Sequence, residues 1–257
     1  MPLLVGPVEF GSFTPQPRLG NPGQVMWRMA PTRSTQNRVG LKNPGARAAA
    51  AFLRTRPLPP VWGLNLAPSP GLSDPEQEAA ELLAALEHFL AAELLPSWVT
   101  LNLSCPNTED DPGAHQTSAK TRLLVWALVE RLGNRAPLWV KVGPGLAQEQ
   151  YQALLRACAE FGAAAIVATN TLPLPTPGQP GQVGGAGGGV LHQAAVEATA
   201  LLAAEVRRQG YGIDVIGCGG ALNRASAHDF QRAGATALQY WSALVYGGPL
   251  AGALLIK

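Results

Sequence analysis

The stretch LWVKVGPGLAQEQYQALLRACAEFGAAAIVATNT, which runs from Leu138 to Thr171, decides the fold class of this chain. It begins with a short apolar run at Leu138, continues through a segment with helical spacing near Gln148–Phe161, and returns to an apolar run at Ala165. Both apolar runs are almost continuously hydrophobic, which is typical of parallel strands that are buried on both faces. The stretch therefore predicts a strand–helix–strand unit of an α/β protein.

The same alternation extends over the rest of the chain. Apolar runs that close on Gly, Asn, Ser or Thr begin at seven positions, which are Pro7, Val61, Trp98, Leu138, Ala165, Asp214 and Ala237. Helical spacing marks segments near 73–95, 119–132, 148–161, 191–208 and 224–233. Ser73 and Glu76 have the pattern of a capping box at the start of the first segment. We interpret the glycine-rich residues 178–189 as a long loop.

The chain length favours one (β/α)8 TIM-type barrel domain over residues 1–257. A barrel of this type takes about 250 residues, and its sites lie at the carboxyl ends of its strands. Only seven of the eight strands that a closed barrel needs are visible in the sequence. An open sheet would expose two strand edges.

Composition excludes several classes of function. The chain has 19 Lys+Arg against 17 Asp+Glu, and its net charge of +2 provides no basic stripe for a nucleic acid. Acidic residues interrupt the longest apolar segment, Ala79 to Leu95, so we expect no membrane span. Cys105, Cys158 and Cys218 are too far apart for a C-x-x-C pair, which favours a cytoplasmic location. The four histidines lack ligand spacing, so we expect no metal.

Cys105 and Lys141 are candidate catalytic residues. Cys105 lies among polar residues, and Lys141 places a charge within an apolar strand. Cys105 lies between Asn102 and Asn107, whose amides could bind a planar polar ligand, although an isolated cysteine is more often a small buried hydrophobe. Lys141 interrupts an apolar strand. Inside a barrel its ammonium group would need an anionic or electron-rich partner, whereas at a strand end it would extend to water.

Three later segments suggest ligand contacts. Residues 169–171, Thr-Asn-Thr, follow the next strand and fit either a polar site or a simple turn. Glycine-rich turns at 184–189 and 217–220 are followed by Tyr-Trp-Ser at 240–242. Paired glycine loops after late barrel strands leave backbone N–H groups free to bind a phosphate.

In their order and spacing, these segments resemble the dihydroorotate dehydrogenase family. The resemblance rests on NLSCPNT at 102–108, Lys141, TNT at 169–171, GG-x-x-G from 184, Gly219-Gly220 and Gln239-x-x-Ser242, together with VEFGSFTP at 8–15, GNP at 20–22 and NRVGLKNPG at 37–45. It covers essentially the whole chain. It implies an FMN-containing (β/α)8 barrel that oxidises dihydroorotate to orotate in pyrimidine biosynthesis.

The resemblance also implies roles for individual residues. The FMN contacts that it implies are Ser12, Asn65, Asn102, Lys141, Thr169, Gly188, Gly220, Trp241 and Ser242. The implied pyrimidine contacts are Asn37, Asn102, Asn107, Asn170 and Thr171. Cys105 would be the base that removes the C5 proton, while a hydride leaves C6 for the flavin. Lys141 would stabilise negative charge on the reduced flavin.

The chain departs from the family pattern in three respects. The opening strand of the family, followed by a loop whose Lys touches flavin and substrate, has no counterpart in this sequence. Two explanations stay open: the start is wrongly assigned and residues are missing upstream of Met1, or the chain is a degenerate relative that has lost this strand. The region around Asn37 resembles the membrane-associated, quinone-linked branch, whereas Cys105 resembles the soluble branch. The segment from Thr108 to Ser118 carries three acidic residues where an anionic substrate would enter.

Several alternatives therefore stay open. The chain could be an FMN-binding barrel that does not turn over dihydroorotate, or a tRNA dihydrouridine synthase, although the latter would need a basic RNA-binding surface. The electron acceptor could be quinone, fumarate or NAD. A homodimer is compatible with the sequence, and peripheral membrane association would depend on residues upstream of Met1.

Overall fold

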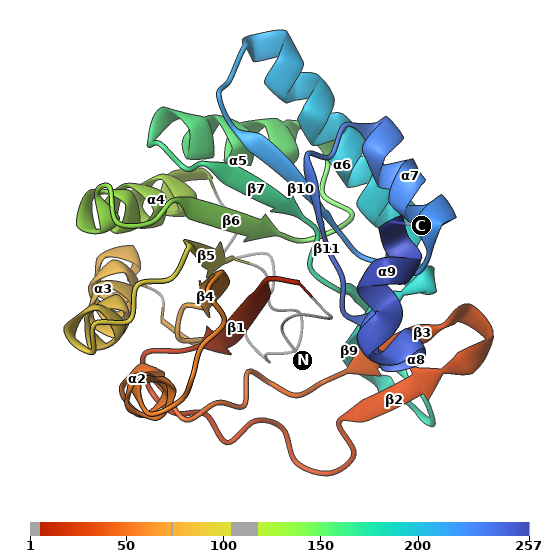
Figure 1. The fold of residues 1–257 in the computed structure, drawn as a ribbon, viewed down its shortest axis with the longest axis horizontal. Coiled ribbons are helices and arrows are strands. Elements are labelled where there is room, and N and C mark those ends of the chain that lie inside the picture. Colours follow the sequence, from red (N-terminus) through yellow and green to blue (C-terminus); the bar gives the residue numbers. More distant parts are fainter. Residues whose placement is uncertain (1–5, 73, 104–117, 257) are drawn as a thin grey trace.

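The structure, a computed structural model, describes residues 6–72, 74–103 and 118–256, and its centre is a curled parallel sheet (Figure 1). The sheet has seven strands in the order β1-β4-β5-β6-β7-β10-β11, and every neighbouring pair is parallel. The strands are β1 (Val8–Phe13), β4 (Trp62–Leu66), β5 (Trp98–Asn102), β6 (Leu138–Val142), β7 (Ala165–Ala168), β10 (Asp214–Cys218) and β11 (Ala237–Gln239). All seven predicted strands are confirmed.

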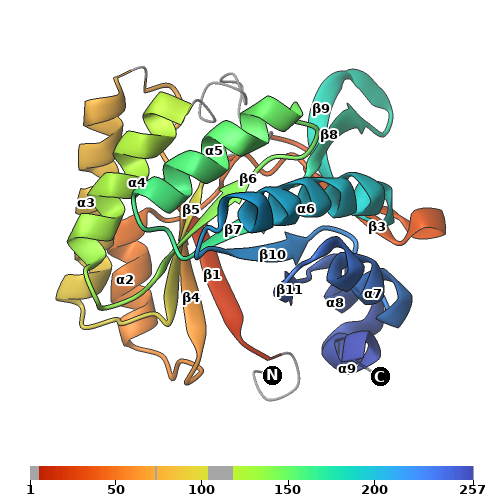
Figure 2. The same ribbon diagram turned by 90° about the horizontal axis from the view of Figure 1, so that it is seen from above.

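Helices cover the outside of the curl, which makes the fold a TIM-type barrel with one strand fewer than eight (Figure 2). They are α2 (Ala46–Arg54), α3 (Pro75–Ala91), α4 (Ser118–Leu132), α5 (Gln148–Glu160), α6 (Gly189–Gln209), α7 (Arg224–Ala233), α8 (Ser242–Gly247) and α9 (Ala251–Ile256). The five predicted helices are confirmed. The capping prediction was wrong in its residue: Asp74 is the N-cap of α3, and its side chain accepts a hydrogen bond from the backbone N–H of Glu76. Ser73 lies outside the described residues.

A second, antiparallel sheet lies beside the barrel and corrects the loop predicted at residues 178–189. Its order is β2-β3-β9-β8, with β2 (Met26–Met29), β3 (Ser34–Asn37), β8 (Leu172–Thr176) and β9 (Gln179–Gly188). Glycines have no side chain to show the alternation of a strand, so β9 is invisible in the sequence pattern. A Cβ at Gly184 would lie 2.9 Å from the carbonyl oxygen of Asn37, so the glycine allows β9 to lie close to β3.

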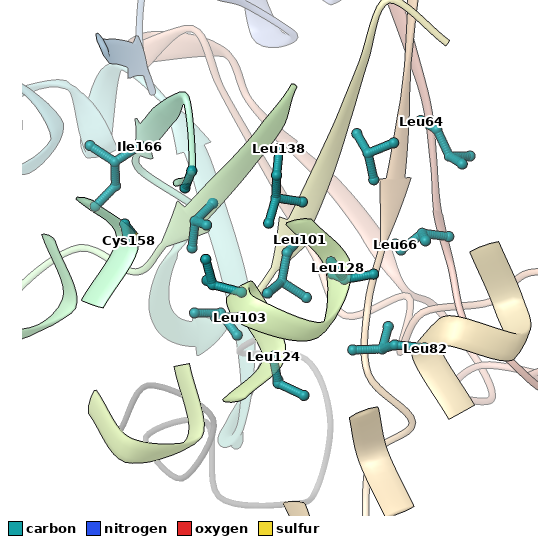
Figure 3. Close-up of a cluster of buried hydrophobic side chains, with 14 of the residues drawn as sticks. Leu64, Leu66, Leu82, Leu101, Leu103, Leu124, Leu128, Leu138, Cys158 and Ile166 are labelled. Carbon is teal, nitrogen blue, oxygen red and sulfur yellow. The ribbon is translucent and has the colours of Figure 1, made fainter. Parts of the chain in front are cut away.

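The hydrophobic core lies between the outer face of the barrel sheet and the helices (Figure 3). Leucines of the strands meet leucines of α3 and α4 there, and the labelled side chains include Leu64, Leu66, Leu101, Leu138, Leu82, Leu124 and Leu128. Along β6 the buried residues are Leu138, Val140 and Val142. The residues between them, Trp139 and Lys141, face the other side of the sheet, because successive side chains of a strand alternate.

The inner face of the sheet carries aromatic and polar side chains. The rings of Trp98 and Trp139 stack there with centroids 4.6 Å apart. Gly63, on the neighbouring strand, makes room for this stack, because a Cβ at Gly63 would lie 2.1 Å from the Trp98 ring. The outer face therefore stabilises the fold, and the inner face is left for a site.

Candidate active site

Polar side chains from three strand ends form a chain of hydrogen bonds at the carboxyl end of the barrel. The Nδ2 of Asn102 donates to the Oγ of Ser12 at 3.1 Å, and the Nδ2 of Asn170 donates to the Oδ1 of Asn102 at 3.0 Å. The Oδ1 of Asn170 accepts from the backbone N–H of Thr171 at 2.8 Å. Ser12 is the last residue but one of β1, Asn102 ends β5, and Asn170 and Thr171 follow β7. The structure therefore brings these predicted contacts together.

Lys141 lies inside the barrel beside polar partners from β10 and β11. Its Nζ is 3.5 Å from the Sγ of Cys218 and 3.5 Å from the Oε1 of Gln239. Burial alone would lower the pKa of Lys141, but the attraction of Cys218 and of Glu9 outweighs burial and raises this pKa above its usual value. The ammonium group therefore has electron-rich partners inside the barrel, which is what an inward-facing Lys141 requires. It does not extend to water from a strand end.

Glu9 is a site residue to which the sequence analysis gave no role. It lies on β1, and its carboxylate accepts hydrogen bonds from side chains of β4, β5 and β11. The donors are Asn65 Nδ2 at 2.8 Å, Trp98 Nε1 at 2.8 Å, Thr100 Oγ1 at 2.6 Å and Gln239 Nε2 at 3.3 Å. A charged residue within a predicted strand is the signal that could have identified it.

A glycine-lined cradle forms where β9, the turn after β10 and the start of α8 meet. A Cβ at Gly188 would lie 2.5 Å from the carbonyl oxygen of Arg33 and 3.1 Å from the Oγ of Ser242. A Cβ at Gly220 would lie 2.6 Å from the carbonyl oxygen of Gly188. The hydroxyl oxygens of Thr35 and Ser242 are 3.1 Å apart. Only glycine fits at 188 and 220, and a buried serine hydroxyl lies beside the first of them.

Two predicted contacts lie at the border of this region. Asn37 is on β3, in the second sheet, where its Nδ2 donates to the carbonyl oxygen of Gly185 on β9 at 3.5 Å. Trp241 is the N-cap residue of α8 and is 62% exposed. Its indole ring is therefore available to a ligand or to solvent.

The residues of this region fit the implied FMN. The Oδ1 of Asn65 is buried and has no hydrogen-bond partner among the described residues, so it is ready to accept from a ligand N–H group. The glycines at 188 and 220 leave backbone exposed at the place where the resemblance puts the phosphate. Lys141 supplies a positive charge inside the barrel, beside Cys218 and Gln239.

The predicted base and one predicted substrate contact fall in a segment that the structure does not describe. Cys105 and Asn107 lie outside the described residues, and so does most of the acidic segment that begins at Thr108. Within the ranges that the structure describes, no three His, Cys, Asp or Glu side chains are grouped as metal ligands. Over the same ranges no helix is long and apolar enough to cross a membrane.

Comparisons with known proteins show the family to which this chain belongs. The sequence model of the family described as "Dihydroorotate dehydrogenase" matches residues 3–257. Among curated proteins, the chain is 30% identical to a dihydroorotate dehydrogenase (quinone) of Agrobacterium fabrum, over 98% of this chain and 70% of the relative. It is 34% identical to the enzyme of the same name from Leifsonia xyli, over 95% of this chain and 72% of the relative.

Solved structures show the same fold at lower identity. The Eimeria tenella DHODH in complex with ferulenol superposes with a TM-score of 0.82 at 23% identity, over 97% of this chain and 73% of the other. The ligand-free form from the same organism gives a TM-score of 0.80 at 22% identity, over 96% of this chain and 74% of the other.

Proposed function

We propose, from the premise that this chain belongs to the dihydroorotate dehydrogenase family, that it oxidises dihydroorotate to orotate with FMN held at the carboxyl ends of the barrel strands. The observation that carries the proposal is the hydrogen-bonded chain of Ser12, Asn102 and Asn170, together with the inward-facing Lys141, which pairs with Asn102 in the sheet. It provides amide donors and acceptors together with one positive charge, which suits a planar, amide-rich, anionic ring.

The residues around this chain divide into contacts for the two ends of FMN. Gly188, Gly220 and Ser242 would hold the phosphate through backbone N–H groups and the hydroxyl. Lys141 and Asn65 would hold the ring, together with Ser12, Asn102, Thr169 and Trp241. When bound, FMN supplies the hydride acceptor that no protein side chain provides.

The protein's own groups then orient the substrate and move a proton. Asn37, Asn102, Asn107, Asn170 and Thr171 would hold the pyrimidine so that C6 faces the cofactor. Cys105 would take the proton from C5. A thiol with a pKa of about 8.5 is only a few per cent thiolate at pH 7. We therefore expect a rate that rises above neutral pH unless the site lowers this pKa.

A reductive half-reaction tests the proposal. We expect the purified protein to carry FMN, dihydroorotate to bleach the flavin absorbance without oxygen, and orotate to form in equal amount. Cys105→Ala should abolish bleaching while FMN stays bound, and Cys105→Ser should keep partial activity with a pH optimum moved upward, since a hydroxyl is the weaker acid.

Cys158→Ala is the matched control, because it removes a sulfur that is fully buried on α5, away from the strand ends. It should bleach at the wild-type rate. A yellow protein that dihydroorotate does not bleach would mean an FMN-binding barrel without this turnover. Bleaching at the wild-type rate by Cys105→Ala would show that another group is the base.

The names of the curated relatives extend the proposal to the electron acceptor. Both relatives described above are dihydroorotate dehydrogenases (quinone), so we propose a quinone as the oxidant of the reduced protein. Rates of reoxidation by a short-chain quinone, fumarate and NAD should differ, with the quinone fastest. Faster reoxidation by fumarate or NAD would contradict this assignment.

A further inference from the structure

The carboxylate of Glu9 accepts from four side-chain donors on three other strands, and none of these contacts is used in the proposed chemistry. Its Oε2 accepts from Trp98, Thr100 and Gln239, and its Oε1 accepts from Asn65 at 2.8 Å. An ionised carboxylate only accepts hydrogen bonds, so every group that points at Glu9 must present a donor.

This requirement decides which way the amide of Asn65 points. Its NH₂ group must face Glu9, and its Oδ1 is therefore turned away from the carboxylate. That oxygen is buried and has no partner within the described part of the chain, in a side chain that is 5% exposed. A buried acceptor left unpaired is unfavourable, so the site is built for a ligand that brings a donor.

We propose that Glu9 is a positioning residue for cofactor binding: it fixes the Asn65 amide so that Oδ1 accepts from the ring N–H of the flavin. This inference rests on the proposed binding of FMN. The pyrimidine part of an isoalloxazine has several acceptors but one N–H donor, at N3. An oriented acceptor therefore selects that edge of the ring, whereas an amide free to turn would accept either kind of group.

The strand register indicates that Glu9 has a specific role and does not merely fill space. Glu9 pairs with Gly63 of β4, and Asn65 lies two residues further along the same strand. A Cβ at Gly11, two residues after Glu9, would lie 2.4 Å from the carbonyl oxygen of Asn65. The backbone of Asn65 therefore lies close against β1, and the hydrogen bond to Glu9 orients its side-chain amide.

The test is a double-mutant cycle on cofactor affinity, measured by quenching of flavin fluorescence in apoprotein titrated with FMN. We expect Glu9→Gln to raise the Kd of FMN about tenfold when Asn65 is present, and less than about twofold in an Asn65→Ala background. Effects that multiply across the two sites would show that Glu9 acts independently of Asn65, through Lys141 or through the fold, and would overturn the proposal. Glu130→Gln, an exposed charge change on α4, should leave the Kd unchanged.

A second probe, 3-methyl-FMN, removes the ring N–H and needs no change at Glu9. Wild-type protein should bind it at least about tenfold more weakly than FMN, and Asn65→Ala should lose most of this preference. An equal preference in both proteins would overturn the proposal even if Glu9→Gln does not fold. FMN binding without dihydroorotate turnover would defeat the proposed function and leave this inference intact, whereas a wild-type protein that binds no FMN would overturn both.

Discussion

The side chain of Lys141 points into the barrel, where its ammonium group contacts the sulfur of Cys218 and the amide oxygen of Gln239 instead of water. The charge is retained there because Cys218 and Glu9 compensate for the loss of water around it. The same charge is therefore available to a cofactor that becomes more negative when it is reduced.

Replacing Lys141 with Ala should weaken flavin binding and slow flavin reduction together. A hydrogen bond from a charged group contributes about 1.5–3 kcal/mol, so we expect a Kd for FMN that is roughly 10- to 100-fold higher. Lys42→Ala, which removes an exposed ammonium, is the control. Unchanged FMN content together with an unchanged rate of bleaching would contradict this role.

The raised pKa of Lys141 predicts how its contribution to stability depends on pH. A cation whose pKa is higher in the folded state stabilises the fold below its unfolded pKa of about 10.4, and this contribution is lost as pH rises through the folded value. The difference in Tm between wild type and Lys141→Met should therefore be constant from about pH 6 to pH 9 and should shrink above about pH 10.5. A difference that already falls between pH 7 and pH 9 would contradict the raised pKa.

Cys158 should resist alkylation in the folded protein. Burial raises the pKa of its thiol to about 12, and the side chain has no exposed surface. At pH 8 we expect native protein to react with iodoacetamide at Cys158 about a thousandfold or more slowly than unfolded protein does. Peptide mass spectrometry of both samples measures this. Comparable labelling of Cys158 in native and unfolded protein would contradict its burial.

At the scale of elements, the second sheet brings glycine backbone to the site. Its strand β3 is joined to α8 by the Thr35 and Ser242 hydroxyls and by the Tyr246 hydroxyl, which donates to the carbonyl oxygen of Ser34 at 2.8 Å. Its strand β9 ends at Gly188, which is also the N-cap residue of α6. The sheet therefore links α8, which follows the barrel strand β11, to the start of α6.

Gly188→Ala should damage this junction, whereas Gly181→Ala in the same strand should not. Gly188 has φ +86, and a Cβ would lie 2.5 Å from the carbonyl oxygen of Arg33, whereas nothing lies within 4 Å of a Cβ at Gly181. We expect Gly188→Ala to lower the free energy of unfolding by about 1–3 kcal/mol and to reduce FMN content. Thermal melts and flavin absorbance per mole of protein measure both effects. Equal melting of the two variants would contradict the close packing at Gly188.

The whole molecule is an open barrel whose edge strands are joined by a side-chain contact. Within the described residues, β1 and β11 each have one neighbour in the seven-stranded sheet. The hydrogen bond from Gln239 to Glu9, at 3.3 Å, connects one edge to the other. A side-chain contact replaces fewer backbone hydrogen bonds than a strand would, so the edges should open more easily than the centre.

Hydrogen exchange should show this gradient across the sheet. We expect amides of β6, which has strands on both sides, to exchange only with global unfolding, and amides of β11 to exchange about a hundredfold faster or more. Exchange resolved by peptide mass spectrometry compares them within one protein. Equal protection of β6 and β11 would show that the edges are as stable as the centre.

Local patterns in the sequence determined the barrel elements and the edge of the sheet that carries the site. Strands such as Leu138–Val142 and helices such as α5 are visible because a run of apolar residues, or apolar residues at helical spacing, is a property of consecutive residues. The family followed from motifs of the same local kind, and the matching family model agrees with it.

Tertiary structure decided what depends on residues far apart in the chain. Asn37 and Gly185, on β3 and β9, meet across 148 positions, and the glycines of β9 become a strand only because β3 supplies the partner. Glu9 meets Gln239 across 230 positions, so the sequence shows an acidic residue in a strand but not the donors that surround it. Hydrophobic periodicity depends only on neighbouring residues in the chain. Strand pairing and buried hydrogen bonds depend on the whole fold, because each needs a partner that only folding brings close.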